Sequence, residues 1–475
     1  MGQLHGAGVI MQISDKIFID ISHFLGNDWS VTEDDLGAYS GKIGDAAEAM
    51  DKLRKDGVGP DGSSVLFPHL PYILEENRLI SEEEKEALLH LDETGKAHDV
   101  LISIGIGGSY LGNQVLFDIF CGTYWNERTR EERGGYPKVY FAGQNMDPAA
   151  LTELIGEIRR CASHMHRKPK VLLLIISKSG TTLEPVTAFR MLKELLSPFC
   201  DLTEMAITDK EKGWLRADAK AEGLPCFTVP DGIGGRFSVF SQVGLVFAAL
   251  LGLPVREFLS GARAAEEACR DRDPKRNPAL MLAALKYIAS DKYGIAAEVT
   301  MPYGTALRSV GWWYAQLLGE SLGKKYDNEG NIVYNGRIPV SAVGTTDMHS
   351  LTQEHQQGGK NKLLQFISVK KPEADLEAFC TEDGHEGRVP MSRMMEAACH
   401  ANEEALAAEH RMSCHIFLEK MDLSHLGALL YFFCLTIAYE GFLENVNAFD
   451  QPGVEDYKKI LHDELKSYIT EHEEN

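Results

Sequence analysis

The sequence predicts an α/β protein with two blocks, each a mainly parallel β-sheet sandwiched by helices. Short apolar runs, such as residues 171–176, alternate with longer helical patterns from residue 99 onward, and the same alternation returns after residue 294. Strands and helices that alternate at this spacing form βαβ units, whose parallel sheets are covered on both faces. A chain of 475 residues, of which 44% are hydrophobic and 25% charged, has the length and composition for two such blocks.

The pattern divides the chain into five segments. Residues 12–93 are expected to be mainly helical, and Ser81 with Glu84 three positions later is typical of a capping box at a helix start. Asp147 followed by Pro148 predicts another helix start further along. The segments are an N-terminal helical segment (1–94), a first α/β domain (95–255), a helical bridge (256–290), a second α/β domain (291–445) and a C-terminal helical arm (446–475).

The charge and the cysteines limit what the protein binds and where it works. A net charge of −22, without a dense Lys/Arg cluster, argues against nucleic acid as a partner. The nine cysteines are odd in number and lack C-x-x-C spacing, which indicates a reducing cytoplasm rather than disulfides or a thiolate zinc site. The N-terminus lacks the features of a secretory signal, and the run closest to a membrane helix, 427–443, is interrupted by Glu440. We therefore expect no membrane association.

One predicted strand runs directly into the cluster "SKSGTT", residues 177–182. The start of a helix leaves backbone N–H groups unpaired, and a single hydroxyl would be enough to cap it. The hydroxyls of Ser177, Ser179, Thr181 and Thr182, together with those amides, match the acceptor oxygens and the charge of a phosphate. We predict a phosphomonoester site here, with plain helix capping as the alternative. The order of residues differs from G-x-x-x-x-G-K-S/T, so a nucleoside triphosphate is not indicated.

A second loop, "GIGGSYLG" at residues 105–112, also joins a strand to a helix. Backbone amides at the helix start, with Ser109 as an extra donor, would form an anion site. Glycines that allow close strand–helix packing are the alternative. A dinucleotide site of a dehydrogenase is disfavoured, because Tyr110 stands where the third glycine of G-x-G-x-x-G is required.

Four isolated polar residues each have a structural and a functional interpretation. Arg236 in "GGRFS" is either a surface ion pair or a cation facing an anion. Glu320, near the apolar side of a helix that begins around residue 305, is either an ion-paired residue or a general base. His349 lies in a predicted first helical turn with His355 as a nearby competitor, and Lys458 lies on a predicted helix surface. Local sequence leaves these alternatives open.

In this order and spacing, the motifs resemble the phosphoglucose isomerase family over residues 95–465, in a form similar to its bacterial members. They are "GIGGSYLG", "SKSGTTLEP", "GGRFSVFSQVGL", "GESLGK", "TTDMHS" and "ENVNAFDQPGVEDYK". The resemblance implies two sugar-isomerase (SIS) domains and a cytoplasmic homodimer of glycolysis and gluconeogenesis. It also implies reversible isomerisation of glucose 6-phosphate to fructose 6-phosphate through a cis-enediol, without metal or cofactor. The loop has Ala448 where the family usually has proline.

The same resemblance implies residue roles. Glu320 would move the proton between C2 and C1, and Arg236 would stabilise the charge of the enediol. His349 would assist ring opening from the neighbouring subunit, and Lys458 would be the lysine of the closing motif. The substrate-binding residues would be Gly108, Ser109, Ser177, Lys178, Ser179, Thr181, Thr182, Gly235 and Gln316.

The chemistry is consistent with these assignments, because one carboxylate can carry out both proton transfers when a cation stabilises the enediolate and water is excluded. Two rivals remain: a related isomerase that also accepts mannose 6-phosphate, and a phosphosugar-binding regulator without turnover. The retained Glu320, His349 and Lys458 argue against the regulator.

Overall fold

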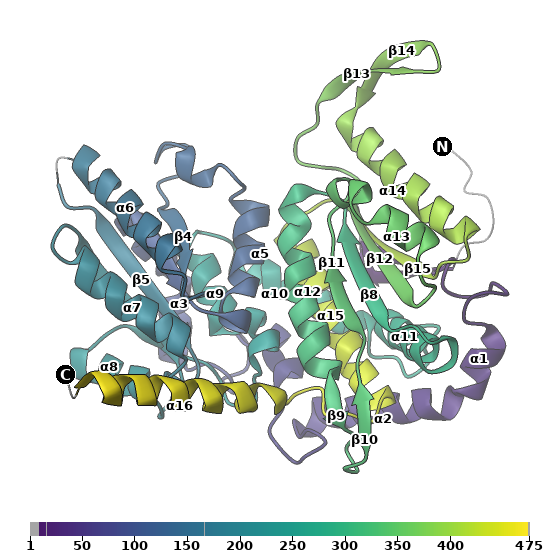
Figure 1. The fold of residues 1–475 in the computed structure, drawn as a ribbon, viewed down its shortest axis with the longest axis horizontal. Helices are drawn as coiled ribbons and strands as arrows, with labels where there is room; N and C mark the ends of the chain where they lie inside the picture. Colours follow the sequence, from purple (N-terminus) through teal and green to yellow (C-terminus); the bar gives the residue numbers. More distant parts are fainter. Residues whose placement is uncertain (1–8, 16, 166, 474–475) are drawn as a thin grey trace.

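The computed structural model describes residues 9–473 except 16 and 166, so the outermost ends of the predicted N-terminal segment and C-terminal arm lie outside the described residues. It contains two separate β-sheets, each flanked by helices (Figure 1). The prediction of an α/β fold with mainly parallel sheets is confirmed. The boundaries of the five predicted segments stay predictions.

The first sheet has five strands in the order β4-β3-β5-β6-β7, and all neighbouring pairs are parallel. Side chains of β5 alternate between two core clusters, which explains its unbroken apolar run and shows that both faces of the sheet are covered. The strands are β3 (Val100–Ile104), β4 (Lys138–Ala142), β5 (Lys170–Ser177), β6 (Asp201–Thr208) and β7 (Cys226–Thr228). The helices are α5 (Leu111–Phe120), α6 (Pro148–His164), α7 (Leu183–Leu196), α8 (Trp214–Glu222) and α9 (Gln242–Leu250).

The second sheet has six strands in the order β1-β2-β15-β12-β8-β11. Its central pairs are parallel, as predicted. The strands are β1 (Ile10–Ser14), β2 (Ile17–Asp20), β8 (Ala297–Pro302), β11 (Ile338–Ser341), β12 (Lys362–Val369) and β15 (Ser413–Leu418). The associated helices are α10 (Val255–Ala268), α11 (Pro278–Tyr293), α12 (Arg308–Leu322), α13 (Thr352–Gln357), α14 (Met391–Ala408) and α15 (Leu423–Leu443).

The N-terminal segment corrects one expectation. Strands β1 and β2 form an antiparallel hairpin that joins the second sheet beside β15, so the expectation of a mainly helical start is wrong there. The reason is a period of two in β-branched residues: Ile13, Ile17 and Ile19 are all fully buried. The rest of the segment is helical, as α1 (Glu33–Ala38), α2 (Ser40–Asp56), α3 (Glu82–Leu89) and α4 (Leu91–Ala97).

Local helix signals behave as predicted. Ser81 and Glu84 form the capping box of α3, and the Asp147 side chain caps α6 with Pro148 in its first turn.

Among the described residues one helix, α15, is long and apolar enough to cross a membrane, but 94% of its most apolar window is buried inside the fold. It packs there against α10 and α11 as a core helix.

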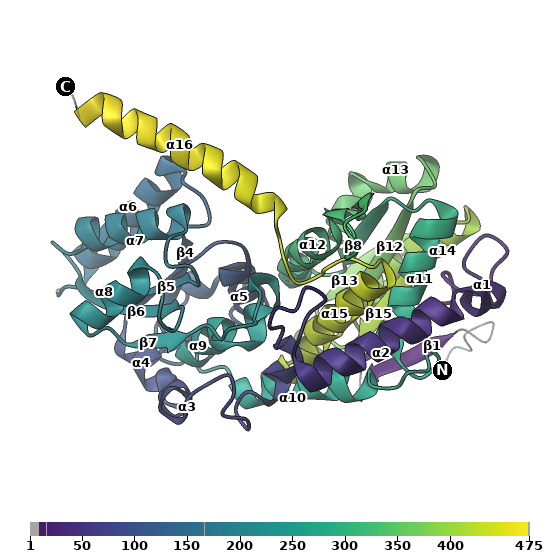
Figure 2. The same cartoon turned by 90° about the horizontal axis from the view of Figure 1, so that it is seen from below.

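Three further elements project from the two sheets. Hairpins β9 (Lys324–Tyr326)–β10 (Ile332–Asn335) and β13 (Glu377–Glu382)–β14 (His385–Pro390) leave the second half. Helix α16 (Gly453–Glu473) extends from the junction of the two halves toward the side of the first sheet, with almost all of its described side chains exposed (Figure 2).

Candidate active site

The predicted phosphate loop and the glycine loop lie at the same edge of the first sheet. Strands β3 and β5 are neighbours and parallel, with Ile104 beside Ile175, so the loops that follow them begin side by side. Carboxyl ends of adjacent parallel strands are where α/β proteins bind ligands. The geometry therefore brings both predicted anion loops to one place.

The hydroxyls of the phosphate loop are directed at one another. Oγ of Ser177 lies 3.4 Å and Oγ of Ser179 lies 3.2 Å from Oγ1 of Thr182, and the Thr181 amide donates to Ser179 Oγ at 3.2 Å. Within the described structure, Thr182 stands at the N-cap of α7 without a side-chain bond to the helix backbone. Thr182 therefore does not cap α7 through its side chain, and the amides at the start of α7 remain available to an anion.

The Lys178 side chain bonds to a residue outside this hydroxyl cluster. Its Nζ donates to the backbone oxygen of Ile233 at 2.9 Å, and its side chain lines a cavity of about 190 Å³ beside Ser63, Ser64 and Phe449. Burial lowers the pKa of Lys178 below its usual value. Its bond to Ile233 ties the phosphate loop to the segment just before residue 235.

One close glycine contact lies within the first half, and another joins the first half to the second. A Cβ added at Gly108 would lie 2.0 Å from the backbone oxygen of Gly235, and one at Gly107 would lie 2.9 Å from Nε2 of Gln316. Gly235 begins the 3₁₀ helix η4 (Gly235–Phe240), and Gln316 lies on α12. At position 108 a side chain would clash with the backbone, so glycine is required there. Gly108, Gly235 and Gln316, for which substrate binding is predicted, therefore lie close together.

Arg236 and Glu320 form an ion pair, with Nη1 of the guanidinium 3.6 Å from Oε2 of the carboxylate. The Arg236 side chain is fully buried, whereas 30% of the Glu320 side chain is exposed. The other carboxylate oxygen accepts from Nε2 of Gln316 at 2.9 Å. Burial lowers the pKa of Arg236 to about 10, although Glu320 and Asp450 favour its charged form. A fixed cation thus lies beside a carboxylate that solvent, or a substrate, can reach.

Neighbouring residues to which the sequence analysis gave no role in the site hold this pair in place. The guanidinium of Arg236 donates to Ser321 Oγ at 2.7 Å, to Gln451 Oε1 at 2.8 Å, to the Asp450 oxygen at 2.9 Å and to the Ala448 oxygen. Three of these residues lie in the quoted motif "NAFDQPG" and one lies next to Glu320, but their partner is distant in sequence. Only the fold reveals the contacts.

Lys324 is a second buried cation near Glu320. Its Nζ donates to the backbone oxygen of Glu320 at 2.8 Å and to that of Asp450 at 2.7 Å, and it pairs with Oδ1 of Asp450 at 2.9 Å. Burial lowers the pKa of Lys324. It ties the end of α12 to the loop that holds Arg236.

His349 lies at the opposite end of α12 from Glu320. It ends the 3₁₀ helix η6 (Thr346–His349), whose preceding loop bonds to Gly304 just before α12, through the Gly344 oxygen at 3.3 Å. A rise of about 1.5 Å per residue separates the two ends of α12 by about 20 Å. His349 is exposed, whereas the competitor His355 is buried at 2% exposure. Within one protomer, His349 therefore lies near the start of α12, and the Arg236–Glu320 pair lies near its end.

Lys458 is also apart from the pair. It is exposed on α16, and its Nζ pairs with Glu455 at 2.8 Å, one turn earlier in the helix. The Arg236–Glu320 site therefore contains neither His349 nor Lys458 among the contacts of the described residues.

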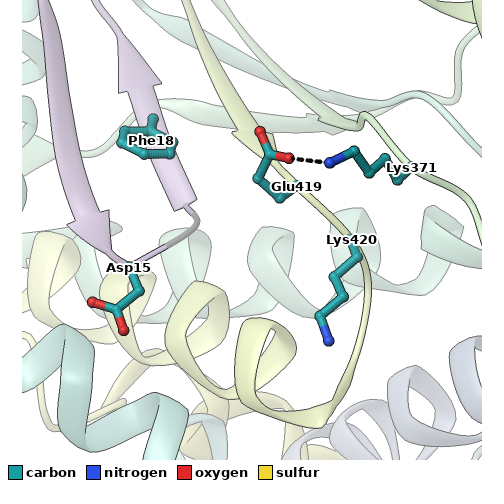
Figure 3. A pocket seen from close by; sticks show the side chains of 5 residues that line it. All are labelled: Asp15, Phe18, Lys371, Glu419 and Lys420. Carbon is teal, nitrogen blue, oxygen red and sulfur yellow. Dashed lines mark ion pairs between the residues drawn. The ribbon is translucent and has the colours of Figure 1, made fainter.

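A cavity of about 390 Å³ lies away from this site, at the ends of β2, β12 and β15 (Figure 3). Phe18 lies on one side, and Lys371 pairs with Glu419 at 3.1 Å on the other. It contains no predicted site residue. In the described part of the chain, no group of three His, Cys, Asp or Glu side chains is arranged to hold a metal ion.

Comparison with known proteins identifies the family. A family model described as Phosphoglucose isomerase matches residues 61–474. The chain belongs to this family. A curated relative, a glucose-6-phosphate isomerase of Carboxydothermus hydrogenoformans, is 35% identical over 441 residues. The match covers 90% of this chain and 90% of that relative. One of Pediococcus pentosaceus is 34% identical over 423 residues, covering 87% of this chain and 89% of that relative.

Two solved structures share the fold. A hypothetical protein from Thermus thermophilus is 27% identical with a TM-score of 0.76, covering 91% of this chain and 96% of that one. A glucose-6-phosphate isomerase from Chlamydia trachomatis has a TM-score of 0.80 at 23% identity, covering 98% and 90% respectively. The family model and the curated relatives confirm the resemblance to the family, and the two structures confirm the fold.

Proposed function

We propose that this member of the phosphoglucose isomerase family interconverts glucose 6-phosphate and fructose 6-phosphate at the Arg236–Glu320 pair. The observation that carries the assignment is this pair itself, a buried guanidinium 3.6 Å from a carboxylate that remains 30% exposed. Isomerisation needs a base for the C–H proton and a cation for the oxyanion that forms, and these two side chains supply both.

The phosphate of the substrate binds at residues 177–182 and Ser109. The supporting features are the clustered hydroxyls, the uncapped start of α7 and the adjacent glycine loop. This end of the sugar does not react, so its binding energy serves to hold C1 and C2 in place. The contact of Gly107 with Gln316 links the phosphate end to the reacting end.

Glu320 removes the proton from C2 of the open-chain aldose. The electron pair of the C–H bond forms the C1–C2 double bond, and the carbonyl oxygen becomes the enediolate oxygen. Arg236 stabilises that negative charge, and its four other hydrogen-bond acceptors hold it in position before the reaction begins. The proton of the C2 hydroxyl then moves to the C1 oxygen, which leaves the negative charge on the C2 oxygen. Glu320 returns a proton to C1 as the C2 carbonyl forms, which completes the ketose.

His349 reaches the site of a second subunit in a homodimer and assists ring opening there. Two observations support this: His349 is exposed, and the loop that precedes it bonds to Gly304 just before α12, whereas Glu320 lies in the last turn of that helix. Support for Lys458 as a further site lysine is the family resemblance alone, since this chain pairs it with Glu455. The nine free cysteines are consistent with a cytoplasmic enzyme.

Glu320→Gln tests the central role. It keeps the shape and the Gln316 contact but removes the base, so turnover should fall by about 10²–10⁴-fold, while fructose 6-phosphate binding measured by calorimetry stays. Glu329→Gln, which changes an exposed carboxylate in the adjoining hairpin turn, is the matched control. High turnover in Glu320→Gln would refute the base assignment.

A further inference from the structure

The second half of the protein contains a cluster of buried charged side chains that takes no part in the reaction described above. Arg337, just before β11, has a side chain that is 2% exposed, and it pairs with three glutamates from β8 and the end of α15. Lys286 on α11 is fully buried and bonds Glu298 at 2.6 Å. The charged members are Lys286, Glu298, Arg337, Glu440 and Glu444.

The charges of this cluster do not balance when all groups are ionised. Two cations face three carboxylates, and an excess buried negative charge is costly. Burial is the main cause that raises the pKa of Glu444 to about 7, and the nearby Glu440 adds to the rise while Arg337 opposes it. The pKa of Glu440 is raised by the same desolvation. A neutral amide at position 444 is therefore a fair substitute for the carboxyl group near neutral pH.

One path leads from Glu444 to the end of α12. Nδ2 of Asn335, the last residue of β10, donates both to Glu444 and to the backbone oxygen of Leu322, the latter at 3.0 Å. Leu322 ends α12, two positions after Glu320. Asn335 thus connects the buried cluster to the helix end that carries the base.

A second path leads from Glu444 to Arg236. Glu444 is the C-cap of α15, and Asn445, which follows it in a left-handed conformation (φ 56°), accepts a backbone bond from Asn328 of the neighbouring hairpin at 2.8 Å. The chain then enters the loop whose Ala448 and Asp450 oxygens accept from Arg236. Glu444 therefore connects to the helix end that carries Glu320 through Asn335, and to the loop that holds Arg236 through the chain that follows it.

We propose that Glu444 and Asn335 are positioning residues for the isomerase reaction, which hold the end of α12 and the loop 445–451 in register so that Glu320 and Arg236 face one substrate. The proposal rests on the roles given to Glu320 and Arg236 above. A shift of about 1 Å between reacting groups can lower a rate by on the order of 100-fold. Loss of this link should therefore reduce turnover more than it reduces binding, because the phosphate loop lies on the other half of the protein.

Asn335→Ala tests the link without removing a buried charged side chain. Asn335 is only half-buried, so the fold should persist, whereas kcat should fall roughly 10- to 100-fold with little change in KM. Ser290→Ala is the matched control, since it removes another contact of Arg337, at 3.3 Å from Nη1, that leads away from the site. An unchanged kcat in Asn335→Ala, or an equal fall in Ser290→Ala, would overturn the proposal.

Position 444 offers a rescue test. Glu444→Gln can still accept from Asn335 and Arg337 and should keep most of kcat. Glu444→Ala removes the acceptor of both and should lose most of kcat at unchanged KM in the fraction that is folded. Equal kcat in the two folded variants would overturn the proposal. Glu320→Gln measured alongside separates the failures, because an active Glu320→Gln refutes the proposed base whatever Asn335 and Glu444 show.

Discussion

Replacing Arg236 by methionine removes the cation beside Glu320 while filling a similar volume. The guanidinium contacts Ser321, Gln451, two backbone oxygens and Glu320. The Asp450 oxygen keeps Lys324 as a donor at 2.7 Å, so the Ala448 oxygen is the backbone group left without its charged partner. One unsatisfied buried acceptor costs about 1–3 kcal/mol, so unfolding in urea should show a loss of that order or slightly more.

The catalytic loss should be larger than the stability loss. Removing one preorganised donor to a developing oxyanion lowers kcat by about 10²–10³-fold. The assay follows glucose 6-phosphate formed from fructose 6-phosphate, coupled to NADP⁺ reduction by glucose-6-phosphate dehydrogenase, on protein shown to be folded. Arg236→Lys, which keeps the charge but reaches fewer partners, should retain more activity than Arg236→Met. Folded Arg236→Met with kcat within threefold of wild type would refute the role of the cation.

Three further outcomes are expected. Ser179→Ala removes one donor to the phosphate, worth about 1.5–3 kcal/mol, so steady-state kinetics should show a higher KM at similar kcat; the reverse pattern would contradict the phosphate assignment. Mixing inactive His349→Ala and Glu320→Gln subunits should restore about a quarter of wild-type activity, because random pairing makes half of the dimers mixed and completes one of their two sites. No recovery in verified mixed dimers would count against an interface role for His349. Gly108→Ala places a Cβ 2.0 Å from a backbone oxygen and should destabilise the protein by about 1–3 kcal/mol in urea unfolding, whereas Gly156→Ala, in open space on α6, should not.

Local signals predicted most of the fold. The unbroken apolar run of β5 reflects burial on both faces of a sheet, and the capping box at Ser81 depends on residues three positions apart. The start of the chain was mispredicted because two short isoleucine-rich strands acquire their identity from pairing with β15, which lies almost 400 residues later. In the local sequence this pairing is reflected only in an alternation of apolar and polar residues, which is too short to predict a strand.

The candidate site was predictable only in part. Arg236 and Glu320 stood out through their motifs, and the structure brings them together. Gln451, Lys324 and the Glu444–Asn335 link were missed, because each matters through a partner in a segment far away in sequence. A place for His349 in the site depends on a second subunit, which local sequence does not encode, and Lys458 lies on α16 paired with Glu455.

The most direct test of the central claim follows one hydrogen atom. Glucose 6-phosphate deuterated at C2 is converted in ordinary water, and the product is analysed by NMR for deuterium at C1. If one carboxylate moves the proton, wild-type protein should yield a fraction of fructose 6-phosphate labelled at C1 with the remainder exchanged into solvent, and Glu320→Gln should show neither transfer nor exchange at a comparable rate. Transfer or exchange at the wild-type rate in folded Glu320→Gln would contradict Glu320 as the base.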